Sequence, residues 1–260
     1  MLSYSTFETN AQSALILYLH GLGMAGWCWE PVRQALPDFG SLVPDLPGHG
    51  GSARQAWRSI SDTAAAVAEV VDTVPADRPV FVVGHSLGAY VGLNLLVQRP
   101  QRFRGAVLSG FHTGHLPKPR LFKLAYLANS IVFRVPFLVR RFSSVLGNAD
   151  LAERFVDGAK VIKPRTIRRA GIQVVDYQPP SAAEVPSVPI LAIAGDREPD
   201  AIRSTPARLE AEYPNARGLV LEGCDHLWPV REPMRYAQIV GEHCADGAPK
   251  LGHQIKEDGA

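Results

Sequence analysis

Residues 80–88, Val-Phe-Val-Val-Gly-His-Ser-Leu-Gly, join a short apolar run directly to a helical pattern. The run Val80–Val83 has the composition of a buried strand, and residues 86–98 carry apolar side chains at helical spacing. A turn this sharp puts Ser86 into a strained backbone conformation, and Gly84 and Gly88 avoid the clashes that a Cβ would cause. The Ser86 hydroxyl is then expected above the carboxyl edge of a sheet, beside a helix N-terminus. This Gly-x-Ser-x-Gly turn predicts a nucleophile.

Short apolar runs alternate with helical patterns on both sides of this turn. Strands are expected at residues 14–19, 41–46, 80–83, 103–108, 189–194 and 216–221. Helices are expected at 27–36, from a cap at Ser61 or Asp62 to about 74, and at 86–98, 201–213 and 232–244. This alternation predicts an α/β fold, with a mostly parallel central sheet covered by helices on both faces.

Residues 112–184 break the alternation, because they contain helical patterns and no clear strand. Helices are expected at 121–132, 137–146, 151–161 and 166–174, with Pro136 ending or kinking the first. We interpret 112–184 as an inserted helical cap over a core made of 1–111 and 185–245, and 246–260 as a disordered tail. The apolar cap residues either line a hydrophobic pocket or pack the cap on the core: Leu121, Phe122, Leu124, Tyr126, Leu127, Ile131, Val132, Phe133, Phe137 and Leu138.

Charge is distributed unevenly between these parts. Residues 112–184 contain twelve Lys+Arg and five Asp+Glu, a net charge of +7, whereas the rest has fifteen against twenty, a net charge of −5. The basic excess, which includes Arg140 and Arg141, has three interpretations. It is a solvated face, the site of an acidic partner such as an acyl-carrier protein or of an anionic substrate, or a loose attachment to an anionic membrane.

Composition limits the class of protein. At 260 residues, 46% hydrophobic and 20% charged, the chain suits one globular domain with an insertion, and a net charge of +2 argues against nucleic-acid binding. Three cysteines favour a reducing compartment over a disulfide framework, with Cys224 as a small buried filler. No Lys or Arg precedes Arg33, and no run approaches the about 18 apolar residues of a membrane span, so we expect no signal peptide, no transmembrane segment and a cytoplasmic protein.

Three further motifs accompany the serine turn in a fixed order. His20-Gly-Leu-Gly23 follows the first long strand, Asp-Leu-Pro-Gly-His-Gly-Gly-Ser occupies 45–52, and Gly223-Cys-Asp-His226 lies near the last helix. On these motifs, over about residues 14–245, the chain resembles the α/β-hydrolase superfamily in its cap-bearing branch. The resemblance implies the α/β-hydrolase fold and serine hydrolase chemistry.

A serine hydroxyl needs a base to take its proton, and the base needs a carboxylate to orient it. His226, between the last strand and the last helix, is the candidate base. The other histidines have other expected roles: His20 supports its loop, His49 and His85 are structural or pocket-lining, His112 and His115 line the pocket, and His243 and His253 lie at the surface.

The carboxylate is less narrowly defined by the sequence. The resemblance implies an acid after the strand that follows the cap, and Glu198, three residues after Gly195, occupies that position. Asp196 and Asp200 remain alternatives.

An oxyanion hole needs two backbone donors. One is expected to be the N–H of Leu87, directly after the nucleophile, and the resemblance favours Leu22 as the other. The sequence does not exclude Gly21 or Gly23 as the second donor.

These residues predict hydrolysis of a carboxylic ester, lactone or thioester through an acyl-Ser86 intermediate, without metal or other cofactor. A serine at this position argues against the related dehalogenases and epoxide hydrolases, which carry aspartate there. Other functions on the same fold stay open: a carbon–carbon bond hydrolase of diketone-like substrates, a slow-turnover ligand receptor, or a cofactor-free haloperoxidase or oxygenase.

Overall fold

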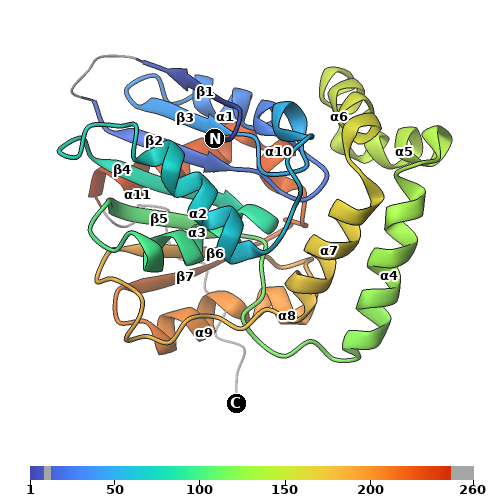
Figure 1. Ribbon diagram of the computed structural model, residues 1–260. Helices are drawn as coiled ribbons and strands as arrows, with labels where there is room; N and C mark the ends of the chain where they lie inside the picture. Colours follow the sequence, from blue (N-terminus) through green and yellow to red (C-terminus); the bar gives the residue numbers. More distant parts are fainter. Residues whose placement is uncertain (9–12, 247–260) are drawn as a thin grey trace.

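One sheet organises the computed structural model, which describes residues 1–8 and 13–246. Its seven strands lie in the order β1-β3-β2-β4-β5-β6-β7 (Figure 1). They are β1 (Tyr4–Phe7), β2 (Leu15–Leu19), β3 (Gly40–Pro44), β4 (Val80–His85), β5 (Phe103–Ser109), β6 (Ile190–Gly195) and β7 (Ala216–Leu221). β1 pairs antiparallel with β3, and every other pair of neighbours is parallel. The predicted fold class, α/β with a mostly parallel sheet, is confirmed.

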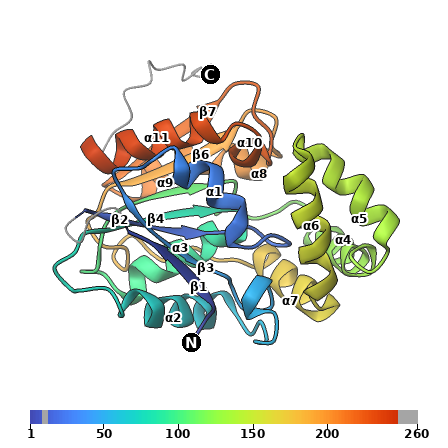
Figure 2. The same cartoon turned by 90° about the horizontal axis from the view of Figure 1, so that it is seen from above.

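Helices cover both faces of the sheet. One face packs against α2 (Ile60–Val71), α3 (Leu87–Gln98) and α9 (Thr205–Glu212), and the other against α1 (Glu30–Gln34) and α11 (Pro233–Asp246). Figure 2 shows α2 and α3 on one side of the sheet and α1 and α11 on the other. Short helices complete this part of the chain: η1 (Gly26–Trp29), η2 (Gly50–Ser52), α8 (Asp200–Arg203) and α10 (Trp228–Arg231).

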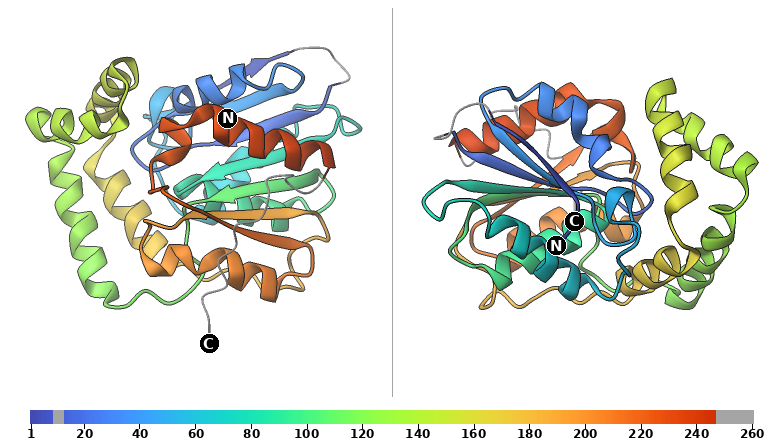
Figure 3. Two further views of the ribbon diagram at one scale, coloured as in Figure 1. Left: turned by 180° about the vertical axis from the view of Figure 1, so that it is seen from behind. Right: turned by 45° about the horizontal axis from the view of Figure 1, so that its top comes forward.

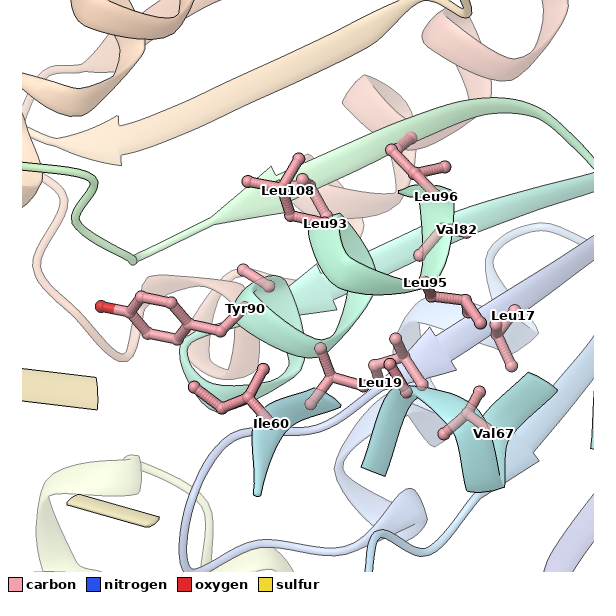
Figure 4. Packing of buried hydrophobic residues seen from close by; sticks show 14 of the residues in the cluster. Leu17, Leu19, Ile60, Val67, Val82, Tyr90, Leu93, Leu95, Leu96 and Leu108 are labelled. Carbon is pink, nitrogen blue, oxygen red and sulfur yellow. The ribbon is translucent and has the colours of Figure 1, made fainter. Parts of the chain in front are cut away.

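The two-residue period of a strand divides β2 between two hydrophobic clusters. Leu17 and Leu19 point to the cluster under α2 and α3, whereas Ile16 and Tyr18 point to the cluster under α1 and α11. In Figure 4, Leu17, Leu19, Val82 and Leu108 of the strands meet Leu93, Leu95 and Leu96 of α3. Burial on both faces explains why the central strands are continuous apolar runs.

Four helices and a short 3-10 helix lie between β5 and β6: α4 (Pro119–Val132), α5 (Pro136–Ser143), η3 (Ser144–Leu146), α6 (Ala149–Val161) and α7 (Pro164–Val175). This α4–α7 segment stands to one side of the sheet, beyond the carboxyl ends of its strands, with α4 alongside α7 and α5 near α6 (Figures 1 and 3). The segment falls within the stretch interpreted above as a cap.

The structure corrects several expected elements. The edge strand β1 was not predicted, and neither was α10. The helix expected at 201–213 is divided at Ser204, because Pro206 lacks the N–H that a continuous helix requires. The cap of α2 is Ser59 and neither Ser61 nor Asp62, since the Ser59 side chain accepts the N–H of Asp62 at 2.9 Å. Apart from residue 246, the predicted tail lies outside the described residues.

Candidate active site

Ser86 is the single residue between the end of β4 and the start of α3. Its backbone has φ 53° and ψ −119°, a conformation that L-residues avoid and that costs on the order of 1–3 kcal/mol. The Ser86 N–H donates to the Ser109 carbonyl oxygen of β5 at 2.8 Å, which ties the turn to the neighbouring strand. The fold therefore holds this side chain at the carboxyl edge of the sheet by a locally strained turn.

The two glycines of the turn are required by close approach and not by positive φ. A Cβ on Gly84 would stand 2.5 Å from the Gly88 carbonyl oxygen, and a Cβ on Gly88 would overlap the Leu19 carbonyl oxygen of β2. Because neither position carries a side chain, α3 can start directly against the sheet.

A continuous chain of hydrogen-bonding groups leads away from Ser86. His226, in the loop after β7, has its Nε2 3.0 Å from Ser86 Oγ and its Nδ1 2.6 Å from Glu198 Oε1. A carboxylate only accepts hydrogen bonds, so the proton on the imidazole belongs on Nδ1, and Nε2 is then free to accept from the serine hydroxyl.

Glu198 lies in the turn after β6, and its side chain is fully buried. Its second oxygen, Oε2, accepts the Gly195 N–H at 2.9 Å, which fixes the carboxylate behind the imidazole. The two alternatives lie elsewhere: Asp200 is exposed and pairs with Arg203 at 2.8 Å, and Asp196 lines the large cavity described below. Of the three predicted carboxylates, the structure brings Glu198 to His226.

The loop 20–23 runs directly beside Ser86, since a Cβ built on Gly21 would lie 3.4 Å from the Ser86 Cβ. Among the described residues, the N–H groups of Leu22 and Leu87 donate to no protein acceptor. Both amides are therefore available to a ligand at the serine.

Two buried histidines join this loop to the loop 45–52. His20 donates from Nδ1 to the Gly21 carbonyl at 2.9 Å and accepts the Leu46 N–H at 3.0 Å. His49 accepts the Gly23 N–H at 3.3 Å. Burial lowers the pKa of His20 to about 4 and that of His49 to about 3, so both rings are neutral at pH 7 and act as supports, as predicted for His20.

The sequence singled out the Asp45–Ser52 motif only through its resemblance, and the structure gives it a physical role. Asp45 accepts the N–H of Gly26 through Oδ1 and that of Gly51 through Oδ2, both at 2.7 Å. The Asp45 carboxylate thus fixes the loop that carries His49.

His85 is a second imidazole at the site, with its ring centre 4.9 Å from that of His226. Its Nδ1 lies 3.0 Å from Ser109 Oγ, which in turn lies 3.1 Å from the Tyr236 hydroxyl. Burial holds the pKa of His85 well below its usual range, so it packs against His226 as a neutral ring. The signal for this role in the sequence is only its place beside the serine.

Two cavities meet at Ser86, His226 and Tyr126, which line both. The smaller measures about 190 Å³ and has an apolar wall that includes Leu22, Val132, Phe133, Val139 and Phe155. The larger measures about 1130 Å³ and has a mixed wall that includes His112, His115, Phe122, Asp196, Asp200, Arg203 and Glu222. His112 and His115 therefore lie where predicted.

The apolar cap residues, which were expected either to line a pocket or to pack the cap on the core, divide into two groups. Phe122, Tyr126, Val132 and Phe133 do line the cavities. The others are exposed to solvent, and for them both expectations are wrong: Leu121, Leu124, Leu127, Ile131, Phe137 and Leu138.

Other predicted positions have mixed outcomes. His243, expected at the surface, is buried on the inner side of α11, and His253 lies outside the described residues. Cys224 is buried, as expected of a filler, and accepts from Arg235 Nη1 at 3.4 Å. In the part of the chain that the structure describes, no group of three or more His, Cys, Asp or Glu side chains is placed to hold a metal ion.

Comparison with known proteins gives three kinds of match. Residues 16–239 match the model of the alpha/beta hydrolase family. Lipase LipV of Mycobacterium tuberculosis is 37% identical over 95 residues, 36% of each chain. The 2-succinyl-6-hydroxy-2,4-cyclohexadiene-1-carboxylate synthase of Escherichia coli is 33% identical over 101 residues, which are 38% of this chain and 39% of that one. These matches span only about four tenths of the curated relatives' length.

Solved structures match nearly the whole chain. A thermophilic esterase from Thermogutta terrifontis has a TM-score of 0.72 at 22% identity, covering 94% of this chain and 92% of that one. A hydrolase from Pseudomonas aeruginosa has a TM-score of 0.76 at 21% identity, covering 94% of both chains. MenH from S. aureus has a TM-score of 0.74 at 17% identity, covering 94% and 98%. At these identities the similarity concerns the fold.

Proposed function

The chain belongs to the alpha/beta hydrolase family, and on that premise we propose that it is a serine hydrolase that cleaves a carboxylic ester, lactone or thioester. One observation carries the proposal: Ser86 Oγ, His226 and Glu198 form an unbroken hydrogen-bonded chain, with 3.0 Å and 2.6 Å between the joined atoms. A strained serine with a base and a buried carboxylate behind it, open to two cavities, suits nucleophilic attack on a carbonyl carbon.

The reaction proceeds in two halves. Ser86 Oγ attacks the carbonyl carbon while His226 Nε2 takes the hydroxyl proton, and the Glu198 carboxylate stabilises the imidazolium that forms. The N–H groups of Leu22 and Leu87 hold the negative oxygen of the tetrahedral intermediate. His226 then gives the proton to the leaving alcohol or thiol, and water, activated in the same way, releases the acid from Ser86. No step needs a cofactor.

The two cavities indicate the size and charge of the groups on either side of the bond that is cleaved. An apolar chamber of about 190 Å³ is close in size to the engineered cavity of ~150 Å³ that holds benzene, so one side of the ester is an apolar group of about that size. The wall of the large cavity contains three carboxylates and one arginine, and that arginine is paired with Asp200. This balance of charge favours an uncharged group on the other side.

Carbon–carbon bond chemistry is a second candidate, favoured by the similarity to the Escherichia coli synthase. That synthase is named for its product, a carboxylate that carries a succinyl group, so the compound it handles is anionic. The wall of the large cavity has an excess of carboxylates, which would repel an anionic substrate. For this reason the ester remains the first proposal.

The test is a comparison of kcat/KM on uncharged 4-nitrophenyl esters and on diketone-like acids, for the native protein and for Ser86→Ala. We expect ester cleavage that is fastest when one side of the ester is an apolar group the size of a benzene ring, and a loss on the order of 10⁵–10⁶ in Ser86→Ala. A serine-directed phosphonate should label Ser86 alone. Full esterase activity in Ser86→Ala would contradict the mechanism, and a preference for the diketone acids would favour the second candidate.

A further inference from the structure

Exposed apolar side chains gather on one part of the molecule. Of the thirteen large hydrophobic residues that are exposed among the described residues, nine belong to the α4–η3 stretch: Leu121, Leu124, Leu127, Ile131, Val135, Phe137, Leu138, Phe142 and Val145. The exposed fractions of Leu121, Ile131 and Phe137 are 60, 62 and 72%. An apolar surface of this kind marks a site of interaction, because isolated exposed residues would be scattered over the molecule.

The spacing of these residues on α4 makes them one stripe. Leu121, Leu124, Leu127 and Ile131 follow each other at steps of three or four residues and therefore share one side of the helix. The opposite side carries Phe122 and Tyr126 into the walls of the cavities. Figures 2 and 3 show α4 and α5 as the outermost elements of the molecule, with α7 between α4 and the core.

The charge of the same stretch has one sign. Residues 118–146 contain six Lys+Arg and no Asp or Glu. Lys123 pairs with Asp176 at 2.7 Å. Within the described part of the chain, Arg120, Arg134, Arg140 and Arg141 have no carboxylate within ion-pair distance. An apolar stripe bordered by unpaired cations is typical of helices that lie in the interface of an anionic membrane.

We propose that this outward face of α4 and α5 docks on the surface of an anionic lipid bilayer, with the apolar side chains entering the boundary between headgroups and acyl chains. The helices lie on the surface and do not span it. Among the described residues no single helix has the length and hydropathy to cross a bilayer, and α4 with α5–η3 reaches both only as a pair bent by 110°.

Two other occupants fit the face less well. A second copy of the chain, related by two-fold symmetry, would bring the six cations of each copy against those of the other. An acidic protein surface would match the cations, but its charged groups would be buried against the nine exposed apolar side chains, which costs free energy. The lipid surface satisfies both the charge and the apolar stripe.

The experiment is flotation of the full chain with vesicles of phosphatidylcholine alone or mixed equally with phosphatidylglycerol. We expect binding to the anionic vesicles that weakens at high salt. Leu124→Ser/Ile131→Ser/Phe137→Ser should abolish this binding. Arg140→Gln/Arg141→Gln should weaken it about fivefold for each cation lost, roughly 25-fold in total. None of these residues lines a cavity, and circular dichroism with thermal melting checks the folding of each variant without reference to activity.

The matched controls lie elsewhere on the surface: Met234→Ser for an exposed apolar residue and Arg54→Gln/Arg104→Gln for exposed cations. Both should bind vesicles as the native chain does. Equal binding by all variants, or no binding to anionic vesicles, would overturn the proposal. So would a dimer in sedimentation that the triple serine variant abolishes, or binding of an acidic carrier protein in place of vesicles. Because binding is measured without catalysis, its failure is separate from failure of the proposed function.

Discussion

The chemistry of the site depends on Glu198, because its carboxylate accepts the hydrogen bond from His226 Nδ1 and is held in place by the Gly195 N–H. In Glu198→Gln the amide can present its NH₂ group to Nδ1 and favour the wrong tautomer of the imidazole. We expect kcat to fall by a factor on the order of 10⁴ with little change in KM. Steady-state kinetics on the best ester of the panel measures this.

The neighbouring carboxylates provide the controls for that substitution. Asp200→Asn removes an exposed ion pair to Arg203, and both Asp200 and Asp196 line the large cavity without contacting His226. Both should keep kcat within about tenfold of the native value. A larger loss in Asp200→Asn than in Glu198→Gln would show that the wrong carboxylate has been assigned.

The sequence could narrow the acid to three residues but could not choose among them. Asp196, Glu198 and Asp200 lie within five positions of one turn, where no helical or strand period applies. The choice is made by the Gly195 N–H, which binds Glu198 Oε2 and turns the carboxylate inward. Ser86 and His226 were predictable because each lies between a strand and a helix that the hydrophobic pattern of the sequence predicts.

At the scale of elements, the contact between α3 and β2 is the tightest requirement of the site. Gly88→Ala would put a methyl group on the Leu19 carbonyl oxygen, so α3 must shift away from the sheet. We expect a loss of unfolding free energy of about 1–3 kcal/mol or more, together with a loss of activity because Ser86 moves with the helix.

Gly158→Ala is the matched substitution within another helix, α6. The new methyl group would meet only the Trp27 Nε1 atom at 4.0 Å, in ordinary contact. This variant should gain about 0.5–1 kcal/mol, since alanine loses less backbone entropy than glycine in a helix. Urea denaturation measures both variants, and equal effects would contradict the account of the turn.

Helix α4 illustrates where sequence patterns cannot decide an element's orientation. It has apolar residues on two sides, with Phe122 and Tyr126 on one and Leu121, Leu124 and Ile131 on the other. Periodicity shows both stripes but not which of them faces the site, and the structure turns the aromatic one inward. The edge strand β1 was missed for a related reason, since its four residues are mostly exposed and carry no buried pattern.

At the scale of the whole molecule, buried histidines make stability depend on pH. The pKa values of His20 and His49, lowered to about 4 and about 3, lie below the value of about 6.5 expected in the unfolded chain. Above about pH 6.5 neither state is protonated, so the stability is complete there. Below about pH 6.5 these histidines bind protons in the unfolded chain but stay neutral in the folded chain. The free energy of unfolding therefore falls by about 1.4 kcal/mol per pH unit for each histidine.

Urea denaturation between pH 7 and pH 4.5 tests this dependence. Burial also lowers the pKa of His85, His112 and His243, which add to the same slope. His49→Asn should reduce the slope by the contribution of one histidine. A free energy of unfolding that stays constant from pH 7 to pH 5 would contradict the assignment of these rings as buried, neutral supports.

In the proposed mechanism, the hydrogen-bonded chain from Ser86 to Glu198 lets Ser86 Oγ accept and then release an acyl group. Rapid acid quench of the enzyme with a 4-nitrophenyl ester, followed by mass spectrometry of its peptides, measures that group directly. We expect a burst of 4-nitrophenol stoichiometric with enzyme and the acyl mass on the peptide that contains Ser86. A burst with the acyl mass on another residue, or full turnover in which Ser86 is never acylated, would contradict it.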